Sequence, residues 1–117
     1  MTGIHLIDKT ITKRELKRIA EERFGDLAKA VVDINQKIMA VGGEFHSDEE
    51  TFLIEKNGSK REDTWGINLY PDKPKEEMIE FDSVINIKPA LGNRSRDVEK
   101  QELKEKIKEI VYNLVSD

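Results

Sequence analysis

Helical and strand-like patterns follow one another along this chain in an order that leaves few folds open. Apolar side chains recur every three or four residues within residues 13–24, and again from about Val98 to Leu114. This spacing is typical of a helix with one apolar stripe. Between the two segments lie several short runs rich in apolar and β-branched residues, which is the pattern of strands. Such a chain must bury its helix stripes against a sheet.

Both ends of the first helix are marked in the sequence. Thr12 is suited to cap the helix, and Glu15 follows at the spacing of a capping box. Ile11 can pack on Leu16 as a hydrophobic staple. Gly25 comes directly after the last apolar position, where a helix commonly ends. The sequence therefore predicts a helix over residues 13–24.

The central segments predict strands joined by turns. A short first strand is expected at residues 4–7, and residues 27–34 and 38–41 form a hairpin across the turn Asn35-Gln36-Lys37. Further extended segments are predicted at residues 52–55, 64–70 and 78–87, the first two as a second hairpin and the last bent or broken in its middle.

These elements predict an α+β fold. We expect a two-layer sandwich with a mainly antiparallel sheet and the two amphipathic helices on one of its faces. The chain has 117 residues and contains no internal repeat, low-complexity tract or linker. Residues 1–117 are therefore expected to form a single domain.

The composition excludes several classes of function. Charged residues make up 38% of the chain and the net charge is −4, so nucleic-acid binding is not favoured. A surface this rich in Lys and Glu also fits a thermophilic origin. The absence of cysteine excludes disulfides and thiol catalysis.

The chain carries no sign of a membrane or secretory destination. Residues 1–10 lack the basic start and the long apolar run of a signal peptide, and no window approaches 18 apolar residues. A cytoplasmic protein without a membrane partner is expected.

The loop Gly92-Asn93-Arg94-Ser95-Arg96 is the first candidate site. It precedes the predicted C-terminal helix, and a helix start combined with guanidinium groups suits an anion such as phosphate or carboxylate. The candidate ligand-binding residues are Asn93, Arg94, Ser95 and Arg96. Alternatively the two arginines pair within the protein with Asp97, Glu99 or a carboxylate such as Asp82, which would make the loop structural.

Glu44, His46 and Asp48 form the second candidate site. They stand at alternate positions, so in an extended segment their side chains would share one face and could hold a divalent metal. The alternative is a solvated acidic segment. Glu49 and Glu50 follow directly and would raise the pKa of His46.

The remaining motifs carry less chemistry. The chain contains no Gly-x-Ser-x-Gly, Walker or His-Glu-x-x-His motif. Trp65 and Tyr70 could offer a stacking platform to a base or sugar, but a tryptophan beside Gly66 is more typical of a packing residue. No cofactor is predicted.

Several strings resemble a known family. They are Ala30-Val31-Val32-Asp33-Ile34, Gly42 through Asp48, Trp65 through Pro71, Phe81-Asp82-Ser83, Ile85 through Pro89 and Gly92 through Arg96. Together they resemble a family of small prokaryotic proteins classed as a domain of unknown function. The resemblance implies a free-standing domain of bacterial or archaeal origin, and it implies no activity, cofactor or catalytic residue.

Three functions from different classes follow. The first is a non-enzymatic cytoplasmic binding module that contacts an anion or a partner through the loop at residues 92–96. The second is a small hydrolase-like or metal-dependent enzyme that uses Glu44, His46 and Asp48. The third is a protein–protein assembly element, which associates through a sheet edge or a helix face and could form a homodimer.

Overall fold

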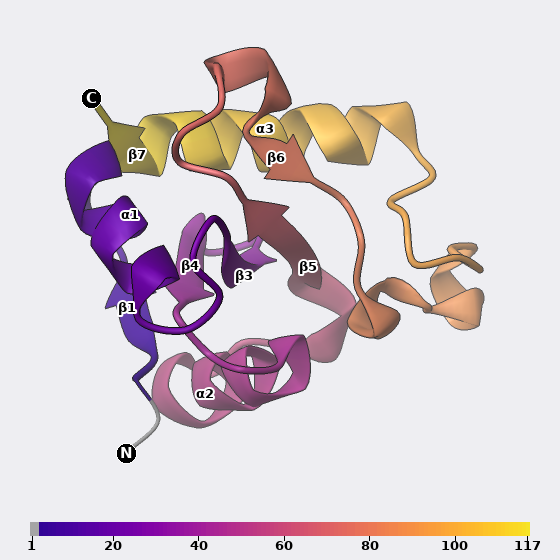
Figure 1. Ribbon diagram of the computed structural model, residues 1–117. Helices are drawn as coiled ribbons and strands as arrows, with labels where there is room; N and C mark the ends of the chain where they lie inside the picture. Colours follow the sequence, from indigo (N-terminus) through magenta and orange to yellow (C-terminus); the bar gives the residue numbers. More distant parts are fainter. Residues whose placement is uncertain (1–2) are drawn as a thin grey trace.

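A five-stranded antiparallel sheet forms the centre of the molecule (Figure 1). The computed structural model describes residues 3–117, so Met1 and Thr2, which begin the N-terminal segment considered above, lie outside the described residues. The strand order is β1-β4-β3-β5-β6. The strands are β1 (His5–Ile7), β4 (Ile38–Val41), β3 (Ala28–Asp33), β5 (Thr64–Leu69) and β6 (Ile79–Glu80).

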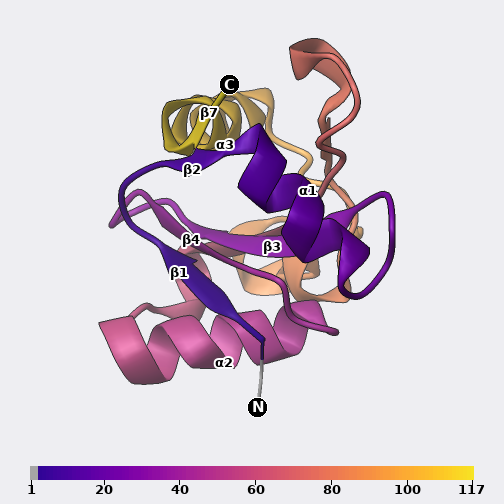
Figure 2. The same cartoon turned by 60° about the vertical axis from the view of Figure 1, so that its left-hand side comes forward.

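Helices cover the two faces of the sheet unequally. Figure 2 shows α1 (Lys13–Glu21) and α3 (Gln101–Leu114) on one side of the sheet and α2 (His46–Asn57) on the other. A parallel pair, β2 (Ile11–Thr12) with β7 (Val115–Ser116), joins the start of α1 to the end of α3. The α+β class, the antiparallel sheet and the two amphipathic helices on one face are confirmed. The structure adds a third helix on the opposite face.

The alternation of side chains along the strands divides the core into two parts. Val32, Met39 and Ile67 point toward α1 and α3 and belong to the larger cluster. Their strand neighbours Val31 and Ala40 point toward α2 and form a smaller cluster with Leu53. Trp65 is buried in the larger cluster, so it packs in the core and is no stacking platform.

The predicted signals at the start and end of α1 are confirmed. The Glu15 backbone N–H donates to the Thr12 hydroxyl at 3.1 Å. Ile11 and Leu16 are both buried in the larger cluster. Gly25 has a φ of +95° and donates its N–H to the Ala20 carbonyl at 2.8 Å, although α1 itself ends at Glu21 rather than at residue 24.

The predicted strand at residues 52–55 is wrong, because this segment belongs to α2. The buried face of α2 contains His46, Glu49 and Glu50 together with a single large aliphatic residue, Leu53. Its helical period is therefore hidden in the sequence, and the short apolar run at its centre is ambiguous. Gly58, with a φ of +66°, ends this helix and does not form a hairpin turn.

Of the extended segment predicted at residues 78–87, only Ile79–Glu80 forms a strand, and the chain breaks after it without resuming a strand. β6 ends at Glu80, and the chain then runs through short 3-10 turns at Val84–Asn86 and Pro89–Leu91 before α3 begins at Gln101. We call residues 81–100 the irregular segment.

Candidate functional site: a polar cluster where α2 meets the irregular segment

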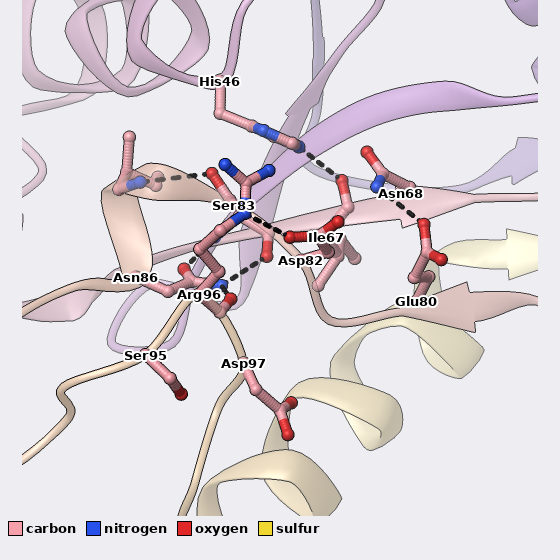
Figure 3. A network of polar contacts seen from close by, with 12 residues as sticks. His46, Ile67, Asn68, Glu80, Asp82, Ser83, Asn86, Ser95, Arg96 and Asp97 are labelled. Atoms are coloured by element: carbon pink, nitrogen blue, oxygen red, sulfur yellow. Dashed lines mark hydrogen bonds and ion pairs between the residues drawn. The ribbon is translucent and has the colours of Figure 1, made fainter.

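Gly66 on β5 creates the space in which this site is built. A Cβ atom at this position would lie 2.6 Å from both Cβ and Oγ of Ser83 and 3.2 Å from Cδ2 of His46. Because glycine has no Cβ, the first residue of α2 and Ser83 of the irregular segment both pack against the backbone of β5. The side chains around this point are shown in Figure 3.

His46 is buried over β5 and is held in one orientation. Its Nε2 lies 2.8 Å from the Ile67 carbonyl oxygen. Since a carbonyl only accepts, Nε2 carries the proton and Nδ1 holds the lone pair of the neutral ring. Burial lowers the pKa of His46 most strongly, the charges of Lys29 and Arg96 lower it further, and the Ile67 contact and Asp82 oppose the shift. The expected rise in this pKa is therefore wrong, and the imidazole is neutral at pH 7.

Asn86 fastens the irregular segment to the sheet. Its side-chain oxygen accepts from the Gly66 N–H at 2.8 Å, and its amide nitrogen donates to the Gly66 carbonyl at 2.9 Å. The same nitrogen donates to the Arg96 carbonyl at 3.0 Å. Asn86 is fully buried. Its amide thus takes the place of a strand backbone where β6 has already ended.

Asn93 likewise bonds to backbone groups through its side-chain amide, here within the loop itself. Its amide nitrogen donates to the carbonyls of Asn86 and Asp97, both at 2.7 Å, and its oxygen accepts from the Glu99 N–H at 2.8 Å. Lys88 and Asn93 also exchange two backbone hydrogen bonds. Asn93 is therefore a buried structural residue, and it fixes the position of the arginines beside it.

The two arginines of the loop differ in their surroundings. Arg96 donates from Nε to Asp82 at 2.6 Å, and the two side chains are 54% and 45% exposed. Within residues 3–117, no hydrogen bond or ion pair engages the exposed Arg94 guanidinium. The loop does not directly precede α3, which begins five residues after Arg96. Asp97, Glu99 and Asp82 were the internal partners considered for the arginines, and Arg96 pairs with Asp82.

Two carboxylates near the loop have other partners. Glu99 accepts from the Arg94 N–H at 2.9 Å. Its pKa is lowered, first by a hydrogen bond from the Ser95 side chain and then by that from the Arg94 backbone. Asp97 lies 3.3 Å from Lys104. Ser95 and Arg94 therefore help to hold the loop in shape.

The structure does not bring Glu44, His46 and Asp48 together. Glu44 and Asp48 line a hollow of about 510 Å³ that also contains Arg23, and Glu44 lies 3.6 Å from that arginine. His46 instead reaches across to β5. No group of three or more His, Asp or Glu side chains among the described residues could hold a metal. The shared face required an extended segment, whereas α2 begins at His46.

Glu49 also holds the start of α2 in place, through a contact with the segment that precedes the helix. Its Oε2 accepts from the Gly43 N–H at 2.9 Å, whereas its buried Oε1 has no hydrogen-bond partner. Burial raises the pKa of this carboxyl well above its usual value, while the Gly43 N–H and the charge of Lys29 oppose the shift, so burial favours the neutral form of the group. A Cβ at Gly43 would lie 2.8 Å from Cγ of Glu49, so only a glycine leaves room for the Glu49 side chain here.

Asp82, Ser83, Asn86 and the pair Asn68–Glu80 were not selected as site residues from the sequence. Asn68 donates to Glu80 at 2.9 Å, and its buried Oδ1 is without a partner. Figure 3 shows Asn68 reaching from β5 to Glu80. Ser83, Asn86 and Asn68 belong to the strings that resemble the family, Asp82 was in addition considered as a partner for the arginines, and Glu80 carried no signal in the sequence. Five of those strings, which contain His46, Gly66, Ser83, Asn86 and Arg96, meet at this site.

The comparisons assign the chain to a family. Residues 5–114 match the family described as "Protein of unknown function (DUF5674)", and the chain belongs to it. No curated protein and no solved structure matches the chain. Among the described residues, no helix is long and apolar enough to span a membrane.

Proposed function

We propose that this chain is a single-domain, cytoplasmic, non-enzymatic binding module that holds an anionic group, phosphate or carboxylate, at Arg96. The proposal narrows the predicted loop site to one arginine and adds the start of α2 beside it. The observation that carries it is the orientation of the Arg96 guanidinium. Asp82 contacts only its Nε, and the terminal Nη atoms point toward Ser83 and the His46 side of the cluster (Figure 3).

The surroundings of Arg96 are suited to an anion. Both Arg96 and Lys29 act electrostatically on His46, so two positive charges lie near that ring. α2 begins there without a side-chain cap, and the start of a helix carries partial positive charge. Because His46 is neutral, its ring neither repels these charges nor titrates near pH 7. An anion at this place would meet donors and positive potential that already exist in the free protein.

Apolar side chains border the same place. Phe45, immediately before α2, is 55% exposed, and Val84 in the irregular segment is 62% exposed. Lys29 lies 5.8 Å from the centroid of the Phe45 ring. A ligand that carries an anionic group next to an apolar part would therefore fit this place.

Phosphate-dependent stability tests the proposal. Any ligand of the folded state raises its apparent stability, by about 1.4 kcal/mol at ten times the dissociation constant. We expect phosphate to raise the melting temperature relative to chloride at equal ionic strength. Arg96→Gln should abolish this increment, while Arg14→Gln on the exposed face of α1 should retain it. Because the Arg96–Asp82 pair is exposed, Arg96→Gln should itself cost under about 1 kcal/mol.

Equal phosphate increments in the unmodified chain and both variants would mean that phosphate acts nonspecifically. The absence of any increment in the unmodified chain, with carboxylates equally without effect, would also contradict the proposal.

A further inference from the structure

A second surface of the irregular segment forms an apolar groove. The groove has a volume of about 420 Å³, and its apolar wall consists of Ile85, Ile87, Ala90 and Leu91. Ile87 and Leu91 are exposed large hydrophobic residues. Lys88, Glu50, Arg61 and Glu62 also line the groove. An amine and three other charged groups thus share a hollow whose apolar wall suits a short alkyl chain.

Lys88 is held rigidly at this groove. Its backbone N–H and carbonyl are both bonded to Asn93, at 2.8 and 3.1 Å. Its side chain is only 12% exposed, and its Nζ lies 5.3 Å from the centroid of the Trp65 ring. The amine therefore has a fixed place and little access to water, unlike the surface lysines of the chain.

Glu50 gives Lys88 only a weak ionic partner. The two oxygens of the Glu50 carboxylate already accept from Arg61 Nη1 at 2.6 Å and from the Thr64 hydroxyl at 2.5 Å. The Lys88 Nζ lies farther away, 3.7 Å from Oε2. Burial lowers the pKa of Lys88, and the nearby Arg61 charge lowers it further, while Glu50 opposes both effects. More of this amine is unprotonated at neutral pH than of an exposed lysine.

We propose that Lys88 and the groove above it form a covalent binding site for small apolar aldehydes. The unprotonated Nζ attacks the carbonyl carbon, and one of its two protons passes to the carbonyl oxygen, which becomes the hydroxyl of a carbinolamine. The nitrogen lone pair then forms the C=N bond as the C–O bond breaks, and the second nitrogen proton goes to the departing hydroxyl, which leaves as water. Amine and aldehyde thus give imine and water, and no oxidant or reductant is needed.

Glu50 stabilises the positive charge that develops on the nitrogen in this reaction. Its Oε2 lies 3.7 Å from Nζ and already accepts from the Thr64 hydroxyl, so the protons move through water in the groove. The apolar wall would hold the alkyl chain of the aldehyde. This site is separate from the proposed anion site, and either can fail without the other.

Reductive trapping tests the proposal. The unmodified protein is incubated near neutral pH with hexanal and cyanoborohydride, and each lysine is followed by peptide mass spectrometry. We expect Lys88 to be alkylated at least about threefold faster than the exposed Lys60, since burial lowers the pKa of Lys88 and a larger fraction of its amine is unprotonated. Leu91→Ser should slow the reaction of Lys88 with hexanal and leave its reaction with acetaldehyde unchanged, because only hexanal reaches the apolar wall.

Two results would overturn the proposal. One is alkylation of Lys88 no faster than that of Lys60 in the unmodified protein, a comparison that needs no variant to fold. The other is a hexanal to acetaldehyde ratio at Lys88 that Leu91→Ser leaves unchanged, with circular dichroism showing that the variant is folded.

Discussion

Replacing Asn86 with alanine is expected to lower the free energy of unfolding by about 3–5 kcal/mol, the largest effect of any polar substitution in the chain. The amide satisfies the N–H and carbonyl of Gly66 and the carbonyl of Arg96, and Asn86 is fully buried. Alanine would leave the two Gly66 groups without this partner, whereas the Arg96 carbonyl would keep the Ser83 N–H as its donor. It would also release the irregular segment from the edge of β5. Urea unfolding followed by circular dichroism measures the loss.

Asn35→Ala is the matched control for this substitution. Asn35 lies in the turn between β3 and β4, where its backbone N–H is bonded to Asp33 and would be retained. We expect it to cost under about 1 kcal/mol. If Asn86→Ala were no more destabilising than Asn35→Ala, Asn86 would not anchor the irregular segment.

Gly66→Ala is expected to cost about 3 kcal/mol through steric overlap. The added Cβ would lie 2.6 Å from Ser83, closer than packed atoms approach, and both neighbours of the clash are buried. Ser83 or His46 would have to move. We therefore expect the His46 ring resonances to shift in the variant, in addition to the change in urea midpoint.

Gly25→Ala separates this steric effect from backbone strain. Gly25 has a φ of +95°, but no atom lies within 4 Å of an added Cβ. Its substitution is expected to cost about 1 kcal/mol. A Gly66→Ala variant at least as stable as Gly25→Ala, with unchanged His46 resonances, would contradict the packing described for the site.

Local periodicity was sufficient to predict the elements that bury one apolar stripe. α1 and α3 each direct Leu or Ile residues to the larger cluster, and the strands at residues 28–33, 38–41 and 64–69 show β-branched and alternating patterns. α2 was not predicted, because Glu49 and Glu50 occupy buried positions of the helix that would ordinarily be apolar. The burial of these carboxyls depends on partners such as Gly43, Thr64 and Arg61, which lie in other elements.

The site was predictable only in its charged part. The pairing of Arg96 with Asp82 was one of the alternatives open from the sequence, because both residue types are conspicuous. The contacts of Asn86 and Asn93 were not predictable, since an asparagine in a loop gives no sign of which backbone groups it will satisfy. The metal hypothesis depended on an extended segment at residues 44–48, and the start of α2 at His46 removes that geometry.

Titration of the isotopically labelled protein with phosphate, followed by NMR, tests the binding site most directly. Saturable shifts of the backbone amides of His46 and Ser47 and of the Arg96 side chain, with the basic face of α1 unaffected, are the predicted result. The same titration of Arg96→Gln should give no saturable shift at the start of α2. Shifts that are spread over Lys13, Arg14 and other surface cations, or that persist unchanged in Arg96→Gln, would contradict an anion site at Arg96.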